Sequence, residues 1–116
     1  MKVVRKDLVL AESDQTIVIE GNHYFPPESI RKEYFQQSDK QTTCPWKGQA
    51  SYYHIVIGDD VEHDAAWYYP EPKDKARQIR NYVAFYKGVT EGWIFEWKLM
   101  QSWDCFIIIL HQWNLL

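Results

Sequence analysis

The sequence predicts a mainly β (α+β) fold: a small antiparallel β barrel or curled sheet with two short helices. Apolar and β-branched runs alternate with short turns, so strands are expected to pair with their neighbours along the chain. Two short stretches, both beginning at prolines, have helical spacing of apolar residues. At 116 residues the chain has the size of one domain. We expect a compact domain over residues 1–92 and an apolar, aromatic extension over residues 93–116.

The first half of the chain begins with a predicted hairpin. Residues 8–13 and 16–21 are apolar runs, and the polar residues 14–15 between them indicate a tight turn. Two consecutive prolines then precede apolar residues at near-helical spacing, which predicts a short helix over residues 27–36. The polar stretch 38–43 is expected to be a loop.

The second half contains the clearest strand, "ASYYHIVIG", over residues 50–58. A turn at Gly58-Asp59-Asp60 leads into a partner strand over residues 61–69. "PEPKDKARQIRNY" predicts a short amphipathic helix, and "YVAFYKG" a returning strand. The last stretch, residues 92–116, has features of both helix and strand. Its uninterrupted apolar run, residues 106–110, is far short of the ~20 residues that span a bilayer.

Composition excludes several classes of function. The formal net charge of −3 provides no long-range attraction to phosphate backbones or anionic lipid, so we expect no nucleic-acid polymer and no membrane as partner. Cys44 and Cys105 lie too far apart in sequence to indicate a disulfide framework or a metal knuckle. We expect free thiols, no metal and no cofactor. No export signal is visible at the N-terminus, so a cytoplasmic location is expected.

Cys44 and Lys47 are the first candidates for chemistry. A nearby ammonium favours the thiolate, which is the reactive form of cysteine. Such a nucleophile needs a base, for which His23, His54 and His63 are candidates. The alternative is that Cys44 is a small buried apolar residue beside a turn and that Lys47 is solvated.

Asp60, Glu62 and Asp64 alternate along a predicted strand, which places their carboxylates on one side. Three such groups suit Mg²⁺ or Mn²⁺, or acid–base chemistry. The alternative is a solvated strand face after a hairpin turn. Asp64 lies nearest to the aromatic residues and is the one that we retain as a candidate.

Aromatic side chains flank this hairpin. Trp67 and Tyr69 share one face of a strand, and Tyr52 lies opposite on its partner. These rings are suited to stacking on a flat ligand such as a nucleobase, although core packing also accounts for them. Glu20 and Tyr24 follow the first predicted hairpin, where they would complete a polar pocket.

Three motifs in order, "AESDQTIVIEGNHYFPPESI", "TTCPWKGQASYYHIVI" and "DAAWYYPEPKDKARQIRNYVAFYKGV", resemble the bacterial family of domain of unknown function 427 over residues 8–90. The resemblance implies a compact β-rich domain. Some members carry a nucleotidyltransferase-like label, but the Gly-Ser and Asp-x-Asp motifs of such transferases are absent from this sequence. The residues that match the family's hallmark positions are Glu20, Tyr24, Pro26, Cys44, Lys47, Gly48, Tyr52, Asp64, Trp67, Tyr69 and Pro72.

These observations support two hypotheses and leave open whether the protein is an enzyme. The first is one aromatic-lined polar pocket for a small, nucleotide-like anion, with Cys44, Asp64 and Glu20 as catalytic candidates. The second is an interaction module that binds another protein or forms a homo-oligomer through its aromatic surface and its apolar C-terminal extension. The residues expected to line the pocket are Glu20, Tyr24, Cys44, Lys47, Tyr52, Asp64, Trp67 and Tyr69.

Overall fold

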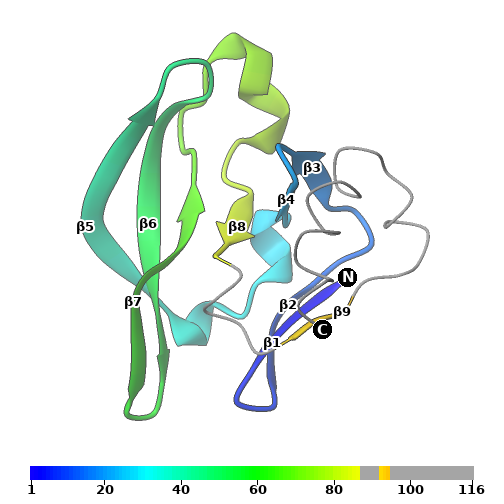
Figure 1. Cartoon of the computed structure of the whole chain (residues 1–116), viewed down its shortest axis with the longest axis vertical. Helices are drawn as coiled ribbons and strands as arrows, with labels where there is room; N and C mark the ends of the chain where they lie inside the picture. The colour runs from blue at the N-terminus through cyan, green and yellow to red at the C-terminus, as the bar shows by residue number, and fades with distance from the viewer. Residues whose placement is uncertain (87–91, 95–116) are drawn as a thin grey trace.

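The computed structural model describes residues 1–86 and 92–94, and its fold is mainly β with antiparallel strand pairs, as predicted (Figure 1). Three 3₁₀ turns connect the strands: η1 (Pro27–Ser29), η2 (Lys32–Tyr34) and η3 (Asp74–Ile79). The strands are β1 (Lys2–Arg5), β2 (Leu8–Glu12), β3 (Ile17–Ile19), β4 (Asn22–Tyr24), β5 (Phe35–Cys44), β6 (Gly48–Ile57), β7 (Asp60–Tyr68), β8 (Val83–Phe85) and β9 (Gly92–Ile94).

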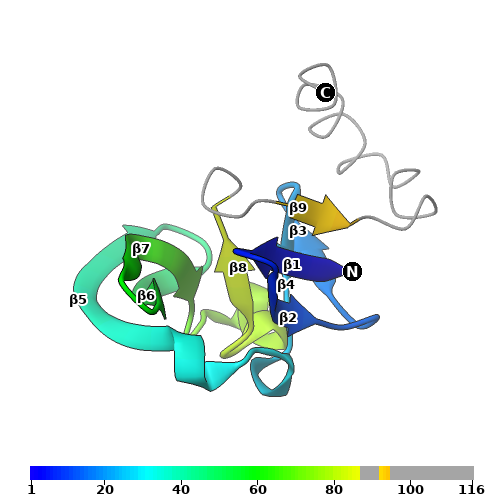
Figure 2. The same ribbon diagram turned by 90° about the horizontal axis from the view of Figure 1, so that it is seen from below.

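The strands form three antiparallel sheets, ordered β2-β1-β9, β3-β4 and β5-β6-β7-β8. The sheet of β5 to β8 is strongly curled and lies on one side of the molecule, with the strands of the N-terminal half on the other (Figures 1 and 2). An isolated bridge between Phe25 and Val83 joins the two halves. The sheets do not close into a barrel within the described part of the chain, so of the two predicted forms the curled sheet is the one observed.

The predicted hairpin of residues 8–13 with 16–21 is wrong. Strand β2 pairs with β1 instead, and β3 pairs with β4. The reason lies in the turns: Lys6 and Asp7 both have positive φ (53° and 63°), and so do Glu20 and Gly21 (55° and 79°). Two successive residues of positive φ form the tight turn that matches the twist of paired strands. Three of these four residues are charged, so composition alone did not mark the turns.

Neither predicted helix forms. Over residues 27–36 the structure has only the turns η1 and η2, because Ile30 between them is extended (φ −92°, ψ 151°) and bridges to Ala11. The second predicted helix is reduced to η3, in which Ala76 departs from helical geometry (φ −117°, ψ 16°). Short helices depend on tertiary contacts for their stability, and here those contacts favour extended backbone.

Residues 38–43, predicted to be a loop, belong to strand β5, which pairs with β6. Their polar composition reflects the place of β5 at the edge of the sheet, where polar side chains discourage pairing with other chains. The predicted strands over residues 50–58 and 61–69 are confirmed as β6 and β7. The loop between them is Gly58-Asp59, with φ +58° at the glycine.

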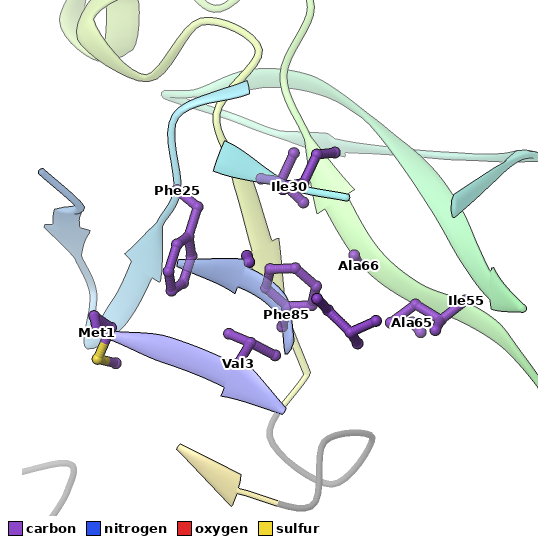
Figure 3. Packing of buried hydrophobic residues seen from close by; sticks show 11 residues of the cluster. Met1, Val3, Phe25, Ile30, Ile55, Ala65, Ala66 and Phe85 are labelled. Atoms are coloured by element: carbon purple, nitrogen blue, oxygen red, sulfur yellow. The ribbon is translucent and has the colours of Figure 1, made fainter. Parts of the chain in front are cut away.

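The core consists of two clusters on the two faces of the curled sheet. The first gathers between the N-terminal strands and strands β7 and β8 (Figure 3), and its largest rings are Phe25 and Phe85 at a centroid distance of 5.8 Å. The second, which we call the aromatic cluster, lies on the other face. The members of the aromatic cluster are Tyr24, Ala50, Tyr52, Trp67, Tyr69, Ala76, Ile79 and Ala84.

Strand β9 pairs with β1, so residues on both sides of the predicted boundary at 92/93 lie in one sheet. Residues 95–116, most of the predicted extension, lie outside the described residues. Among the described residues, no helix has the length and apolar character needed to cross a membrane.

Candidate functional site

Lys47 ends the turn that connects β5 to β6, and local geometry directs its side chain inward. Gly48 has φ +112°, a conformation that favours glycine, and lies against the backbone of residues 71–73. The Lys73 N–H donates to the Lys47 carbonyl at 2.9 Å, and the Lys73 ammonium donates to the Pro45 carbonyl at 2.8 Å. The turn is thereby held at both ends, and the Lys47 side chain is only 7% exposed.

The Lys47 ammonium is surrounded by aromatic rings and one carboxylate. It donates to Glu20, which is 55% exposed at the tip of the β3–β4 hairpin. It also lies 5.4 Å from the ring centroid of Trp46 and 5.6 Å from that of Tyr69, distances at which a cation is attracted to a ring face. We call Lys47, Glu20, Trp46, Tyr24 and Tyr69 the lysine site.

The ionised forms of both partners are favoured. The hydrogen bond from Lys47 is the main reason that the pKa of Glu20 is lowered, with a smaller contribution from a Trp46 hydrogen bond. Burial disfavours the Lys47 ammonium, but the hydrogen bond to Glu20 and the neighbouring tyrosines outweigh it, so that the pKa of Lys47 is raised. At neutral pH the lysine site therefore holds an ammonium that is paired with a carboxylate.

The wall behind the ammonium is made of interlocked rings. Trp67 Nε1 donates to the Tyr24 hydroxyl at 3.1 Å, and the two rings meet edge to face. Tyr24 also lies 6.5 Å from Tyr69 between centroids. Burial raises the pKa of Tyr24, and it raises that of Tyr69 to about 12, so both hydroxyls stay protonated. The wall is uncharged and rigid.

The aromatic cluster continues along β6 to exposed side chains. The hydroxyls of Tyr52 and Thr42 share a hydrogen bond of 2.8 Å, and the Lys40 ammonium lies 4.8 Å from the Tyr52 ring centroid. Tyr86, which is 43% exposed, packs on Trp67 at 4.6 Å between centroids. Burial raises the pKa of Tyr86 to about 12.

Cys44 is partly buried and packs against the aromatic cluster. It pairs with Gly48 across the turn, whereas the rings of His54 and His63 meet edge to face at a centroid distance of 4.9 Å farther along the hairpin. His23 is buried and shares a hydrogen bond with Thr16. Cys105 lies outside the described residues.

The three alternating carboxylates do not converge. Asp60 and Glu62 both bind Arg5 of β1, at 2.9 Å and 2.7 Å. Asp64 has φ 53° and contacts Ser38 and His54 instead. In the part of the chain that the structure describes, no three His, Cys, Asp or Glu side chains are arranged to hold a metal ion.

Seven of the eight residues predicted to line a pocket thus adjoin one another: Glu20, Tyr24, Cys44, Lys47, Tyr52, Trp67 and Tyr69. Asp64 lies apart, about 20 Å along β6 from Lys47, because it sits opposite His54 and a strand rises ~3.3 Å per residue. Sequence reasoning missed Trp46, although it adjoins Lys47. It also missed Thr42 and Tyr86, which nothing in the sequence places beside Tyr52 and Trp67.

The chain was compared with known proteins. The model of the family NTP_transf_9, described as Domain of unknown function (DUF427), matches residues 1–96, most of the chain. No curated protein matches it.

Proposed function

We propose that this chain, which belongs to the family described as Domain of unknown function (DUF427), binds a small anion at Lys47. The aromatic cluster would form the wall of that site, and a phosphorylated or nucleotide-like compound is the ligand class that this combination fits best. Lys47 supplies the charge, Trp46 and Tyr69 supply ring faces, and Glu20 is the group that the ligand replaces.

The observation that supports the proposal is the mismatch in exposure between Lys47 and its counter-ion. The ammonium is 7% exposed, whereas the carboxylate of Glu20 is 55% exposed. Burying an ammonium away from water costs free energy unless an anion lies beside it. Glu20 fulfils that requirement from a hairpin tip, so it can turn into solvent without disturbing the core. An incoming phosphate or carboxylate then forms the same charge-assisted hydrogen bond.

Trp46 favours an anion that carries a flat group. The ring is 36% exposed and adjoins the ammonium, so a ligand whose anionic group lies on Lys47 has an aromatic face within reach. Stacking of a base on an aromatic side chain contributes about 1–3 kcal/mol. A ring-bearing phosphate is therefore expected to bind more tightly than inorganic phosphate.

The test is a thermal-shift screen of the full chain against nucleoside monophosphates, sugar phosphates and inorganic phosphate, followed by calorimetry of any compound that raises the melting temperature. Lys47→Met keeps the length and apolar stem of the side chain and is expected to abolish binding. The matched control is Lys75→Met, an exposed lysine in η3.

Glu20→Gln separates the proposal from a purely structural ion pair. If the ligand replaces Glu20, removal of its charge increases affinity for the anion, because competition is lost. An unchanged or reduced affinity in Glu20→Gln would contradict replacement. Absence of any shift across the panel would contradict anion binding itself.

Self-association is the alternative function, and its predicted surface, residues 93–116, lies almost wholly outside the described residues. Light scattering of the full chain over a range of concentrations tests it. A concentration-dependent dimer that is lost in a chain ending at residue 96, where the family match ends, would favour this alternative.

A further inference from the structure

Both neighbours of β6 bulge at adjacent positions. Between the pairs Gln37↔Tyr53 and Gln41↔Ser51, three residues of β5 face one residue of β6. Between the pairs Tyr53↔Ala66 and Ile55↔Glu62, three residues of β7 face one. Bulges of this kind redirect side chains and are frequent beside functional sites.

The side chains of the two bulges meet across β6. Ser38 Oγ, in the β5 bulge, donates to Asp64 Oδ1 in the β7 bulge at 2.5 Å, and it accepts the Lys40 N–H at 3.1 Å. The Asp64 N–H donates to His54 Nδ1 at 3.0 Å. Ser38 is 8% exposed, and Asp64 has φ 53°, which is unusual for a residue other than glycine. These bonds fix Asp64 in a conformation that it would not otherwise favour.

Two hydrogen-bonding groups of the bulges have no described partner. Since His54 Nδ1 accepts a hydrogen bond, the neutral ring carries its proton on Nε2, which is then a donor. No described residue bonds Nε2 of His54 or Oδ2 of Asp64. The two side chains are 21% and 32% exposed, so solvent reaches both. The facing side chains of His54 and Asp64 thus offer one hydrogen-bond donor and one acceptor.

An aromatic face adjoins this pair. Tyr86 follows β8, packs on Trp67 and is 43% exposed. The Tyr86 N–H donates at 3.1 Å to the carbonyl of Ala65, the residue that follows Asp64, so Tyr86 is held beside the β7 bulge. The negative charge of Asp64 also contributes to the raised pKa of Tyr86. The Lys40 ammonium lies 4.8 Å from the centroid of the Tyr52 ring, on the neighbouring strand pair.

We propose that His54, Asp64 and Tyr86 form a second binding site, separate from the lysine site, for the hydrogen-bonding edge of a nucleobase. A ring nitrogen of the base accepts the Nε2–H of His54, and an adjacent amino group donates to Oδ2 of Asp64. The face of the base lies against Tyr86. Adjacent donor and acceptor atoms on a flat ring are the feature that nucleobases share, and an aromatic side chain binds their faces.

The test uses adenosine, which presents a ring nitrogen beside an amino group, and N6,N6-dimethyladenosine, which lacks that donor. Both are titrated into the ¹⁵N-labelled full chain, and the Asp64 N–H and His54 Nε2 resonances are followed. We expect saturable shifts with adenosine and affinity at least about tenfold lower for the dimethyl compound, the loss of one hydrogen bond to a charged group.

Asp64→Asn is the decisive variant. Asparagine tolerates positive φ, and its oxygen can still accept from Ser38, but its second atom becomes a donor. Adenosine affinity is expected to fall at least about tenfold. Asp39→Asn, at an exposed carboxylate of the β5 bulge, should not change it. Lys47→Met should not change the affinity for adenosine either, so the experiment tests this site independently of the lysine site.

Three results would overturn the proposal: equal affinity of Asp64→Asn and the unmodified chain, equal binding of the two nucleosides, or no saturable shift.

Discussion

Gly48 is the residue on which the inward direction of Lys47 depends. Its φ of +112° is one that other residues rarely adopt, and a Cβ there would lie 3.3 Å from the Glu71 carbonyl oxygen and 3.4 Å from the Lys73 nitrogen. Both neighbours are backbone atoms, and the Lys73 N–H already holds the turn through the Lys47 carbonyl. The turn therefore tolerates only glycine at this position.

We predict that Gly48→Ala lowers the free energy of unfolding by about 1–3 kcal/mol, the range for a strained backbone position. Urea denaturation measures the change. Gly58→Ala is the control: its φ of +58° is also positive, but no atom lies within 4 Å of the added Cβ. It should cost only about 1 kcal/mol. Equal effects of the two substitutions would show that crowding at Gly48 is unimportant.

Glu20 makes stability depend on pH in a defined direction. Its pKa is lowered in the folded protein, mainly by the hydrogen bond from Lys47. A carboxyl with a depressed pKa stabilises the fold above its unfolded value, and that stabilisation is lost as the pH falls through the folded pKa.

Stability is therefore expected to fall as the pH decreases below 4.5, the ordinary pKa of a glutamate, and Glu20→Gln should reduce this dependence. The contribution is below about 1 kcal/mol, because the side chain is half exposed and solvent screens the pair. Melting temperatures of both chains between neutral and acidic pH measure it. Parallel curves would mean that the Glu20–Lys47 pair does not contribute to the acid dependence.

At the scale of elements, Arg5 connects the first hairpin to the β6–β7 hairpin. Its Nε and Nη2 bind the two carboxylate oxygens of Asp60 at 2.9 Å and 3.3 Å, and Nη2 also binds Glu62 at 2.7 Å. The hydrogen bond from Arg5 is the main reason that the pKa of Asp60 is lowered. The carboxylates predicted to form a solvated strand face are thus the contact between two elements.

We predict that Arg5→Lys destabilises the fold by about 1 kcal/mol, because an ammonium cannot form the forked pair of hydrogen bonds. Lys2→Ala is the control on the same strand: the Lys2–Glu12 pair is longer, at 3.9 Å, and both side chains are more exposed. That change should stay within about 0.5 kcal/mol. Chemical denaturation of the two variants compares them, and equal losses would contradict a specific role for Arg5.

For the whole molecule, Phe85 of the short strand β8 links the two halves. Its ring lies 5.8 Å from Phe25, which follows β4, and 5.8 Å from Phe35, which begins β5. It is 1% exposed. Since β8 also bridges to Phe25 through Val83, the curled sheet and the N-terminal strands share one core.

Phe85→Ala is expected to cost about 3–5 kcal/mol, the usual loss for a buried phenylalanine. This is a large part of the ~5–15 kcal/mol that stabilises a domain, so we expect both halves to unfold together in one transition at a lower temperature. Tryptophan fluorescence and circular dichroism should give coincident curves. The exposed Val61→Ala serves as control. Two separate transitions would contradict a shared core.

The fold class, the strands β6 and β7 with their turn, and most residues of the lysine site could be predicted from the sequence. These depend on local patterns: alternation of apolar residues, a glycine between two strong strands, and Lys47 beside Gly48. The predicted position of Tyr52 opposite the aromatic run of the partner strand is also confirmed, since Tyr52 pairs with Trp67.

The strand pairing of the N-terminal half, the absence of the two predicted helices and the position of Asp64 depend on tertiary contacts. Partners in a β sheet depend on contacts between distant residues, so the pairing of β1 with β2, and the extended Ile30 in place of a helix, could not be predicted from local preference. Strict alternation also predicted Asp64 beside Asp60 and Glu62, and the bulge in β7 directed it to Ser38 instead. A bulge is defined by the pairing of two strands, because extra residues of one strand face a single residue of the other. The sequence of one strand therefore does not show where a bulge occurs.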